Sequence, residues 1–189
     1  MNRFIVLFLL SFVLQASGED EQTNFSIITT KGYISYNAAS KWKVVTMNTK
    51  PPSTASLFRI PNPADEGTSN PTNLVLMTFE TDSPEAMAAF TDILKSLPPE
   101  SKRTTYGKWE CVFHKEKQGP TEYSICDAYK KLPVATVLVR IAWPNLAGNP
   151  KDYDHKMEAV FHAVLDSVAS GMGPVPKKEG QELLRPVEN

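Results

Sequence analysis

The stretch from Asn73 to Phe90, NLVLMTFETDSPEAMAAF, decides the fold because its hydrophobic period changes partway along. Its first part, Asn73 to Phe79, is strongly apolar and favours a buried β-strand. Ser83, Pro84 and Glu85 then form a typical helix start: a capping hydroxyl, a proline whose missing N–H costs nothing, and an acid at the positive helix end. The apolar residues that follow lie on one helical face and end before a proline pair: Met87, Phe90, Leu94 and Leu97, then Pro98 and Pro99. A strand followed by an amphipathic helix is therefore predicted.

The rest of the chain follows the same two periods. Alternating apolar residues predict strands at Phe25–Thr29, Tyr33–Tyr36, Trp42–Met47, Ser56–Ile60, Thr105–Lys115, Glu122–Lys130 and Val134–Trp143. A second helix is expected to begin with Asn149 as its cap and Pro150 in its first position, and to continue until Gly171. The sequence thus predicts an α+β fold: an antiparallel β-sheet of about six strands or more, packed by two amphipathic helices.

Two connections have clear turn or loop composition. Lys31-Gly32 is expected to form a tight turn, because glycine accepts positive φ without steric cost. Pro61 to Pro71, with three prolines among small and polar residues, is expected to be a long loop.

Met1 to Gly18 has the layout of a secretory signal peptide. Arg3 precedes an apolar run from Phe4 to Leu14, small residues follow, and the acidic residues begin at Glu19. Since the apolar run is about half of the ~20 residues that span a bilayer, cleavage after Gly18 is favoured over an uncleaved anchor. The mature chain is then exported, to the periplasm or the extracellular space, with no segment left for stable membrane insertion.

Length and charge limit the remaining possibilities. Residues 19–172 have the size of a single domain, and residues 173–189 are rich in Pro, Lys and Glu, which predicts a flexible C-terminal tail. The net charge is −1, from 20 basic and 21 acidic side chains spread along the chain. No electrostatic surface for nucleic acid or an anionic membrane is therefore expected.

Cys111 and Cys126 flank a turn sequence, Lys117-Gln118-Gly119-Pro120. A hairpin centred between Gln118 and Gly119 places the two cysteines directly opposite each other. With a four-residue loop they occupy a non-hydrogen-bonded pair, where Cα atoms approach to about 4.5 Å, within the range of a disulfide. A disulfide is therefore predicted in an oxidising compartment, with two buried free thiols as the alternative.

Few residues suggest chemistry. Asp154, Glu158 and His162 are spaced by four on the second predicted helix, which would allow a metal site but is also the ordinary pattern of a solvated helix face. His114 is expected opposite Tyr123 in a surface pair near the hairpin tip. Phosphate-binding, nucleophile-elbow and zinc-protease motifs are missing from the sequence, so no catalytic residue, cofactor or metal ligand is assigned.

A weak binding site is predicted where the last strand ends. Trp143 closes that strand, and Asn145 and Leu146 lie in the loop after it, so the three could line the rim of a cleft. Trp42 and Trp109, by contrast, alternate with charged neighbours and are expected to be core residues.

The order of elements resembles that of the PsbP-like α/β/α sandwich family over Phe25 to Ala169. The residues that carry the resemblance are Trp42, Leu57–Ile60, Asn73–Leu76, Gly107–Trp109 and Phe161–Val168. The resemblance implies an α/β/α sandwich that acts as a binding or adaptor module, and it assigns no functional residue.

These observations favour an exported, non-enzymatic binding or accessory module that acts through protein–protein contacts, as an adaptor or an immunity-like partner. The alternative is a periplasmic protein that binds a small ligand or a metal, using the Trp143 rim with the Pro61–Pro71 loop, or the Asp154 group. A hydrolase with a dispersed triad is a third hypothesis, which would need a histidine beside a serine or cysteine in a cleft.

Overall fold

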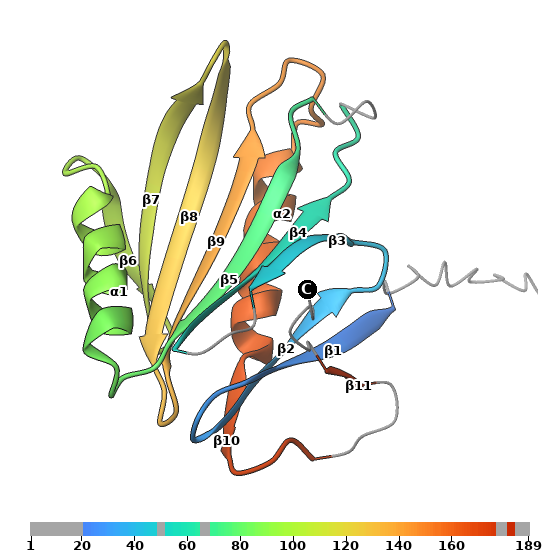
Figure 1. Ribbon diagram of the computed structural model, residues 1–189. Coiled ribbons are helices and arrows are strands. Elements are labelled where there is room, and N and C mark those ends of the chain that lie inside the picture. Colours follow the sequence, from blue (N-terminus) through green and yellow to red (C-terminus); the bar gives the residue numbers. More distant parts are fainter. Residues whose placement is uncertain (1–20, 49–51, 65–68, 177–180, 184–189) are drawn as a thin grey trace, which may run out of the picture.

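The computed structural model describes residues 21–48, 52–64, 69–176 and 181–183. Within these ranges the chain forms two helices and two sheets, of seven and four strands (Figure 1). The larger sheet, in the order β3-β4-β5-β9-β8-β7-β6, contains β3 (Lys43–Asn48), β4 (Ser53–Ile60), β5 (Thr72–Phe79), β6 (Lys102–Tyr106), β7 (Trp109–Gln118), β8 (Thr121–Lys131) and β9 (Thr136–Pro144). The smaller sheet, in the order β10-β2-β1-β11, contains β1 (Gln22–Ile28), β2 (Gly32–Ala39), β10 (Ala169–Met172) and β11 (Gln181–Leu183).

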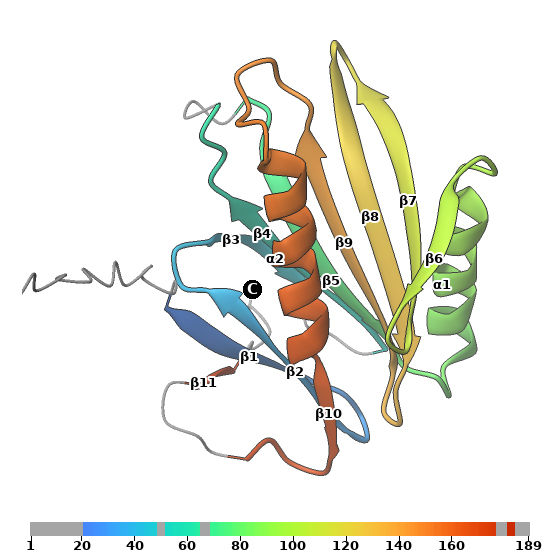
Figure 2. The same ribbon diagram turned by 180° about the vertical axis from the view of Figure 1, so that it is seen from behind.

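Each face of the larger sheet carries one helix. All its neighbouring strands are antiparallel, and α1 (Pro84–Ser96) and α2 (Tyr153–Ser167) lie on opposite faces (Figures 1 and 2). The predicted α+β fold, an antiparallel sheet packed by two helices, is confirmed. The central strands β5 and β9 are fully buried on the α2 side, whereas their other side, with Asn73, Val75 and Arg140, is only half-buried.

The helix α1 begins as the sequence predicts. The Ser83 hydroxyl accepts a hydrogen bond from the backbone N–H of Ala86 at 3.2 Å, and Pro84 occupies the first turn. Phe90 anchors the helix on the sheet, with its ring centroid 5.4 Å from Phe79 and 5.6 Å from Tyr129. The helix gives way to extended backbone at Leu97, immediately before the proline pair.

The predicted start of α2 is wrong by one turn. Asn149 does not cap the helix, because its side chain donates to the Pro144 carbonyl at 2.7 Å instead. The helix starts at Tyr153, after Asp152, and the Tyr153 hydroxyl is hydrogen bonded to Thr72 at 2.8 Å. A contact with a strand distant in sequence therefore sets where the helix begins.

The smaller sheet is an addition to the predicted architecture. It packs beside α2 on the same face of the larger sheet, and its residues belong to the same apolar core. The rings of Phe25, Tyr36 and Phe58 lie 5.2 to 6.1 Å from one another, which joins β1, β2 and β4. The Tyr36 hydroxyl, fully buried, is satisfied by Ser56 at 2.8 Å.

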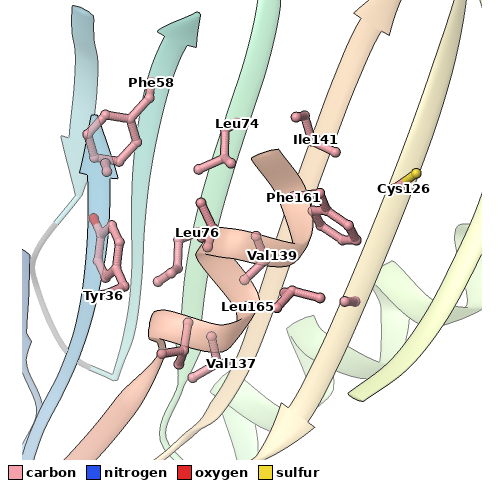
Figure 3. Close-up of a cluster of buried hydrophobic side chains, with 14 of the residues drawn as sticks. Tyr36, Phe58, Leu74, Leu76, Cys126, Val137, Val139, Ile141, Phe161 and Leu165 are labelled. Atoms are coloured by element: carbon pink, nitrogen blue, oxygen red, sulfur yellow. The ribbon is translucent and has the colours of Figure 1, made fainter. Parts of the chain in front are cut away.

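The core between α2 and the larger sheet is a layer of aliphatic and aromatic side chains. Figure 3 shows this layer, in which the buried residues are Tyr36, Phe58, Leu74, Leu76, Val137, Val139, Ile141, Phe161 and Leu165. Five of these come from alternate positions of β5 and β9, so the two-residue period of the strands places them on one face.

A buried carboxylate ties the two sheets together. Glu80 directly follows β5, and its two oxygens accept hydrogen bonds from the backbone N–H and the hydroxyl of Thr30, both at 2.7 Å. Thr30 lies in the turn between β1 and β2. This turn is thereby fixed to the end of the larger sheet.

The chain ends meet in the smaller sheet. The strand β10 follows α2 directly and pairs with β2, and β11 pairs with β1 in parallel. Gln181–Leu183, assigned from the sequence to a flexible tail, thus extends the smaller sheet. The predicted signal peptide, residues 1–18, lies outside the described residues. No helix in the described ranges is long and apolar enough to cross a membrane.

The predicted reason for Gly32 is wrong. Its φ is not positive; instead, β10 passes so close that a Cβ at Gly32 would lie 2.0 Å from the Gly171 carbonyl oxygen. Only a residue without a side chain allows this approach of two backbones.

We therefore predict that Gly32→Ala lowers the free energy of unfolding by about 1–3 kcal/mol, because β10 must move away from β2. Urea denaturation measures the change. Gly148→Ala is the matched control, since its Cβ would meet only Ala64 at 3.4 Å, an ordinary contact. Equal stability of the two variants would contradict this explanation.

The predicted hairpin register is also wrong. Its loop has two residues, Gly119 and Pro120, between the paired Gln118 and Thr121. Gly119 has φ +61°, and proline fixes a negative φ, which is the combination of a type II′ turn. In addition, the predicted strand Thr105–Lys115 is two strands, because Gly107, at φ +57°, turns the chain between β6 and β7.

This register separates the cysteines. Cys111 lies opposite Ala128 and Cys126 opposite Phe113, so the cysteines are diagonal neighbours on one face. Diagonal Cα atoms are about 7–8 Å apart, beyond the usual disulfide range of about 4.4–6.8 Å. Both thiols are free and buried. The predicted disulfide is therefore contradicted.

Alkylation of the purified chain in denaturant, without reductant, is expected to label both cysteines, as detected by intact mass. The native protein should react slowly, because Cys111 and Cys126 are almost fully buried. An unlabelled denatured chain would show that the thiols are bonded and that the hairpin has another register.

Candidate functional site

A groove of about 220 Å³ lies where the first two turns of α2 cross β7, β8 and β9. We call it the α2 groove. Its lining includes Phe113, Lys115, Ser124, Cys126, Trp143, Asp154 and Glu158.

Strand pairing brings the sheet residues of the groove together. Phe113 lies opposite Cys126, Lys115 opposite Ser124, and Ser124 opposite Trp143. Phe113 and Lys115 are two positions apart on β7, as are Ser124 and Cys126 on β8, and Trp143 is paired with Ser124, so all five point toward α2. Asp154 and Glu158, one helical turn apart, complete the groove from the other side.

Trp143 is a buried wall of the groove and not the exposed rim that the sequence suggests. Only 3% of its surface is exposed. Its indole N–H donates to an Asp154 carboxylate oxygen at 2.7 Å, which fixes both side chains relative to each other. The second Asp154 oxygen has no hydrogen bond to this indole.

Asn145 lies at the groove margin but belongs to a polar network. Its amide donates to Glu122 at 3.0 Å, and its carbonyl oxygen accepts from Ser124 at 3.1 Å. Leu146 is half-buried and does not line the groove. Of the three residues predicted to form a rim, Trp143 is thus a wall of the groove, Asn145 lies at its margin and Leu146 lies outside it, in the adjacent loop.

The groove has an excess of negative charge. The Lys115 ammonium is bound to Glu122 at 2.9 Å, and this contact, with the Asn145 amide, holds the pKa of Glu122 below its usual range. Lys115 is thereby neutralised, whereas Asp154 and Glu158 both face the groove. Burial raises the pKa of the Cys126 thiol far above its usual value, and the nearby Glu158 carboxylate raises it further. The thiol is therefore a neutral part of the groove.

The structure brings Asp154 and Glu158 together but draws His162 away. The His162 ring stacks on Tyr106 with centroids 4.0 Å apart and an angle of 4°, and the Tyr106 hydroxyl donates to Asp166. Within the described ranges no group of three or more His, Cys, Asp or Glu side chains is arranged to hold a metal ion.

A buried charged cluster on the α1 side of the sheet was missed by the sequence reasoning. Asp127 is fully buried and accepts from Arg140 Nε at 2.7 Å and from a terminal Arg140 nitrogen at 3.2 Å. His114 Nδ1 lies 3.9 Å from the same carboxylate, with no hydrogen-bond partner.

The predicted surface pair of His114 with Tyr123 is wrong, because His114 lies opposite Ile125 and its side chain is buried. The sequence shows an acid, Asp127, inside one apolar strand and a single arginine, Arg140, inside another. The structure pairs these two residues directly.

Asp127→Ala is expected to lower the free energy of unfolding by about 3 kcal/mol, because it removes a fully buried carboxylate and leaves the Arg140 charge unpaired in a partly buried position. The double variant Asp127→Leu with Arg140→Met should recover most of this loss, since an apolar pair needs no partner. Urea denaturation of the single and double variants tests both expectations. A double variant less stable than Asp127→Ala would contradict this account.

Comparisons with known proteins give only distant matches. No protein-family model and no curated protein matches the sequence. Among solved structures, a protein from Bacteroides thetaiotaomicron matches with a TM-score of 0.44 and 17% identity over 78% of this chain, which spans 46% of that protein's length. LpqN, a protein involved in cell envelope biogenesis of Mycobacterium tuberculosis, matches with a TM-score of 0.44 and 12% identity over 79% of this chain and 91% of LpqN. The resemblance to PsbP-like proteins stays a prediction.

Proposed function

We propose that this chain is an exported, non-enzymatic binding module whose α2 groove receives a basic side chain of a protein partner. The proposal depends on one observation: two carboxylates, Asp154 and Glu158, face a small groove whose opposite walls are aromatic side chains, the neutral Cys126 thiol and Lys115, a lysine already bound by Glu122. The signal-peptide layout of residues 1–18 supports the exported location.

The size of the groove favours a side chain over a whole small molecule. Typical small-molecule pockets measure about 300–1,000 Å³, whereas this groove measures about 220 Å³. A groove of this size can enclose the end of one long side chain while the rest of the partner lies on the surrounding surface. A protein or peptide partner meets this condition.

The charge of the groove favours a cation. Asp154 is held in place by Trp143, so one carboxylate oxygen is used by the indole and the other is left for a ligand. Lys115 does not compensate the carboxylates, because Glu122 already binds it. An arginine suits this arrangement, since its planar guanidinium can donate to two carboxylates and stack against an aromatic wall such as Phe113.

Titration with two blocked tripeptides tests the proposal. Acetyl-Gly-Arg-Gly-amide should bind at least about tenfold more tightly than the same peptide with citrulline, which has the shape of arginine without its charge. Chemical-shift changes in the labelled protein should centre on Trp143 and the first turns of α2. Equal binding of both peptides, or shifts elsewhere, would contradict the proposal.

Charge-removing variants provide the second arm. Glu158→Gln and Asp154→Asn should each weaken binding of the arginine peptide by about tenfold, because each removes a charge-assisted hydrogen bond. Asp154→Asn keeps an oxygen that can accept from Trp143, so the fold should be retained. Asp92→Asn is the matched control, since Asp92 is an exposed helical carboxylate on α1. If this control weakens binding equally, the attraction is not specific to the groove.

A further inference from the structure

A second hollow, of about 450 Å³, lies over β6, β7 and β8. The side chains that matter in it are Arg103, Thr105, Glu110, Val112 and Tyr129. Strand pairing places them on one face: Arg103 lies opposite Val112, Thr105 opposite Glu110, and Glu110 opposite Tyr129. Tyr129 contacts Phe90 of α1, so this is the α1 face of the sheet, opposite to the α2 groove.

Two opposite charges border this hollow without pairing. Arg103 and Glu110 are diagonal neighbours across β6 and β7, a spacing of about 7–8 Å between Cα atoms, which long side chains can bridge. No ion pair joins them. Within the described part of the chain, the Arg103 guanidinium has no hydrogen-bond or ion-pair partner. The exposed Arg103 therefore faces the same hollow as Glu110 without forming an ion pair with it.

The carboxylate is held in position by a neighbour. The Tyr129 hydroxyl donates to one oxygen of Glu110, which leaves the other oxygen available. Burial, and then the hydrogen bond to Glu110, raise the pKa of Tyr129 to about 12, so this hydroxyl remains a donor at neutral pH. The buried side chain of Val112 and the Tyr129 ring supply an apolar surface between the polar groups.

We propose that this hollow binds a small zwitterion, a free α-amino acid with an apolar side chain. The Arg103 guanidinium holds its carboxylate with two parallel hydrogen bonds, and the free oxygen of Glu110 holds its ammonium group. Thr105 offers a hydroxyl beside them, and the apolar side chain lies against Val112 and Tyr129. The hollow has the volume of a typical small-molecule site. This inference is independent of the proposed function of the α2 groove.

Calorimetric titration of the mature chain with three related probes tests it. L-leucine has both charges, N-acetyl-L-leucine only the carboxylate, and L-leucinamide only the ammonium group. We expect L-leucine to bind at least about tenfold more tightly than either analogue. An analogue that binds as tightly as L-leucine would overturn the proposal, and so would no heat of binding for L-leucine up to about 20 mM, roughly the weak limit of a specific site.

Substitutions assign the binding to this hollow. Arg103→Gln and Glu110→Gln should each weaken L-leucine binding by about tenfold, and Gln at position 110 can still accept from Tyr129. Lys102→Gln is the matched control, because Lys102 is an exposed cation on the same strand whose side chain points to the other face. Circular dichroism verifies that each variant is folded. Unchanged binding in both charge variants, or an equal loss in the control, would refute this location.

Discussion

The apolar face of the larger sheet that lies toward α2 must be covered, and the rest of the structure depends on this constraint. On that face β5 and β9 carry a row of large apolar side chains, which an uncovered sheet would expose to water. One helix covers only part of a seven-stranded sheet. On the α2 side the smaller sheet therefore supplies the remaining cover, through the rings of Phe25 and Tyr36 against Phe58. Burying a polar tyrosine there is tolerated because Ser56 satisfies its hydroxyl.

The same constraint determines where binding can occur. On the α2 face the cover is complete over β5 and β9 and incomplete toward β7 and β6, beyond the edge of α2 (Figure 2), whereas the α1 face of β5 and β9 is only partly covered. The α2 groove and the hollow beside Arg103 both lie over β7 and β8, on opposite faces of the sheet. At these margins charged side chains can be partly enclosed without being fully removed from water, which keeps their desolvation cost low. Glu158 is in this intermediate situation, and Arg103 is exposed.

Local patterns predicted most elements, and contacts distant in sequence explain the errors. The Ser83 cap and the first helix needed only neighbouring residues and are confirmed, whereas α2 starts late because Tyr153 binds Thr72 and Asn149 binds Pro144. The predicted centre of the hairpin was wrong by one residue. This error keeps each side chain on its face of the sheet but shifts its cross-strand partner by two positions, so Cys111 and Cys126 share a face without lying opposite each other.

Trp143 and the spacing of Asp154 and Glu158 were visible in the sequence. Their convergence with Phe113 and Lys115, and the buried Asp127 cluster, depend on a strand register that the sequence does not reveal.

The position of β10 has a consequence for how the protein forms during synthesis. Because β2 lies between β1 and β10, its second partner is made only after more than a hundred further residues have emerged. A hairpin of β1 and β2 alone is marginally stable in water. The segment of β1 and β2 is therefore expected to stay largely unfolded until β10 has been synthesised. Pairing of strands so distant in sequence is slow. A ribosome-bound chain that stops before Ala169 should thus be a much better substrate for proteases and chaperones than the complete one.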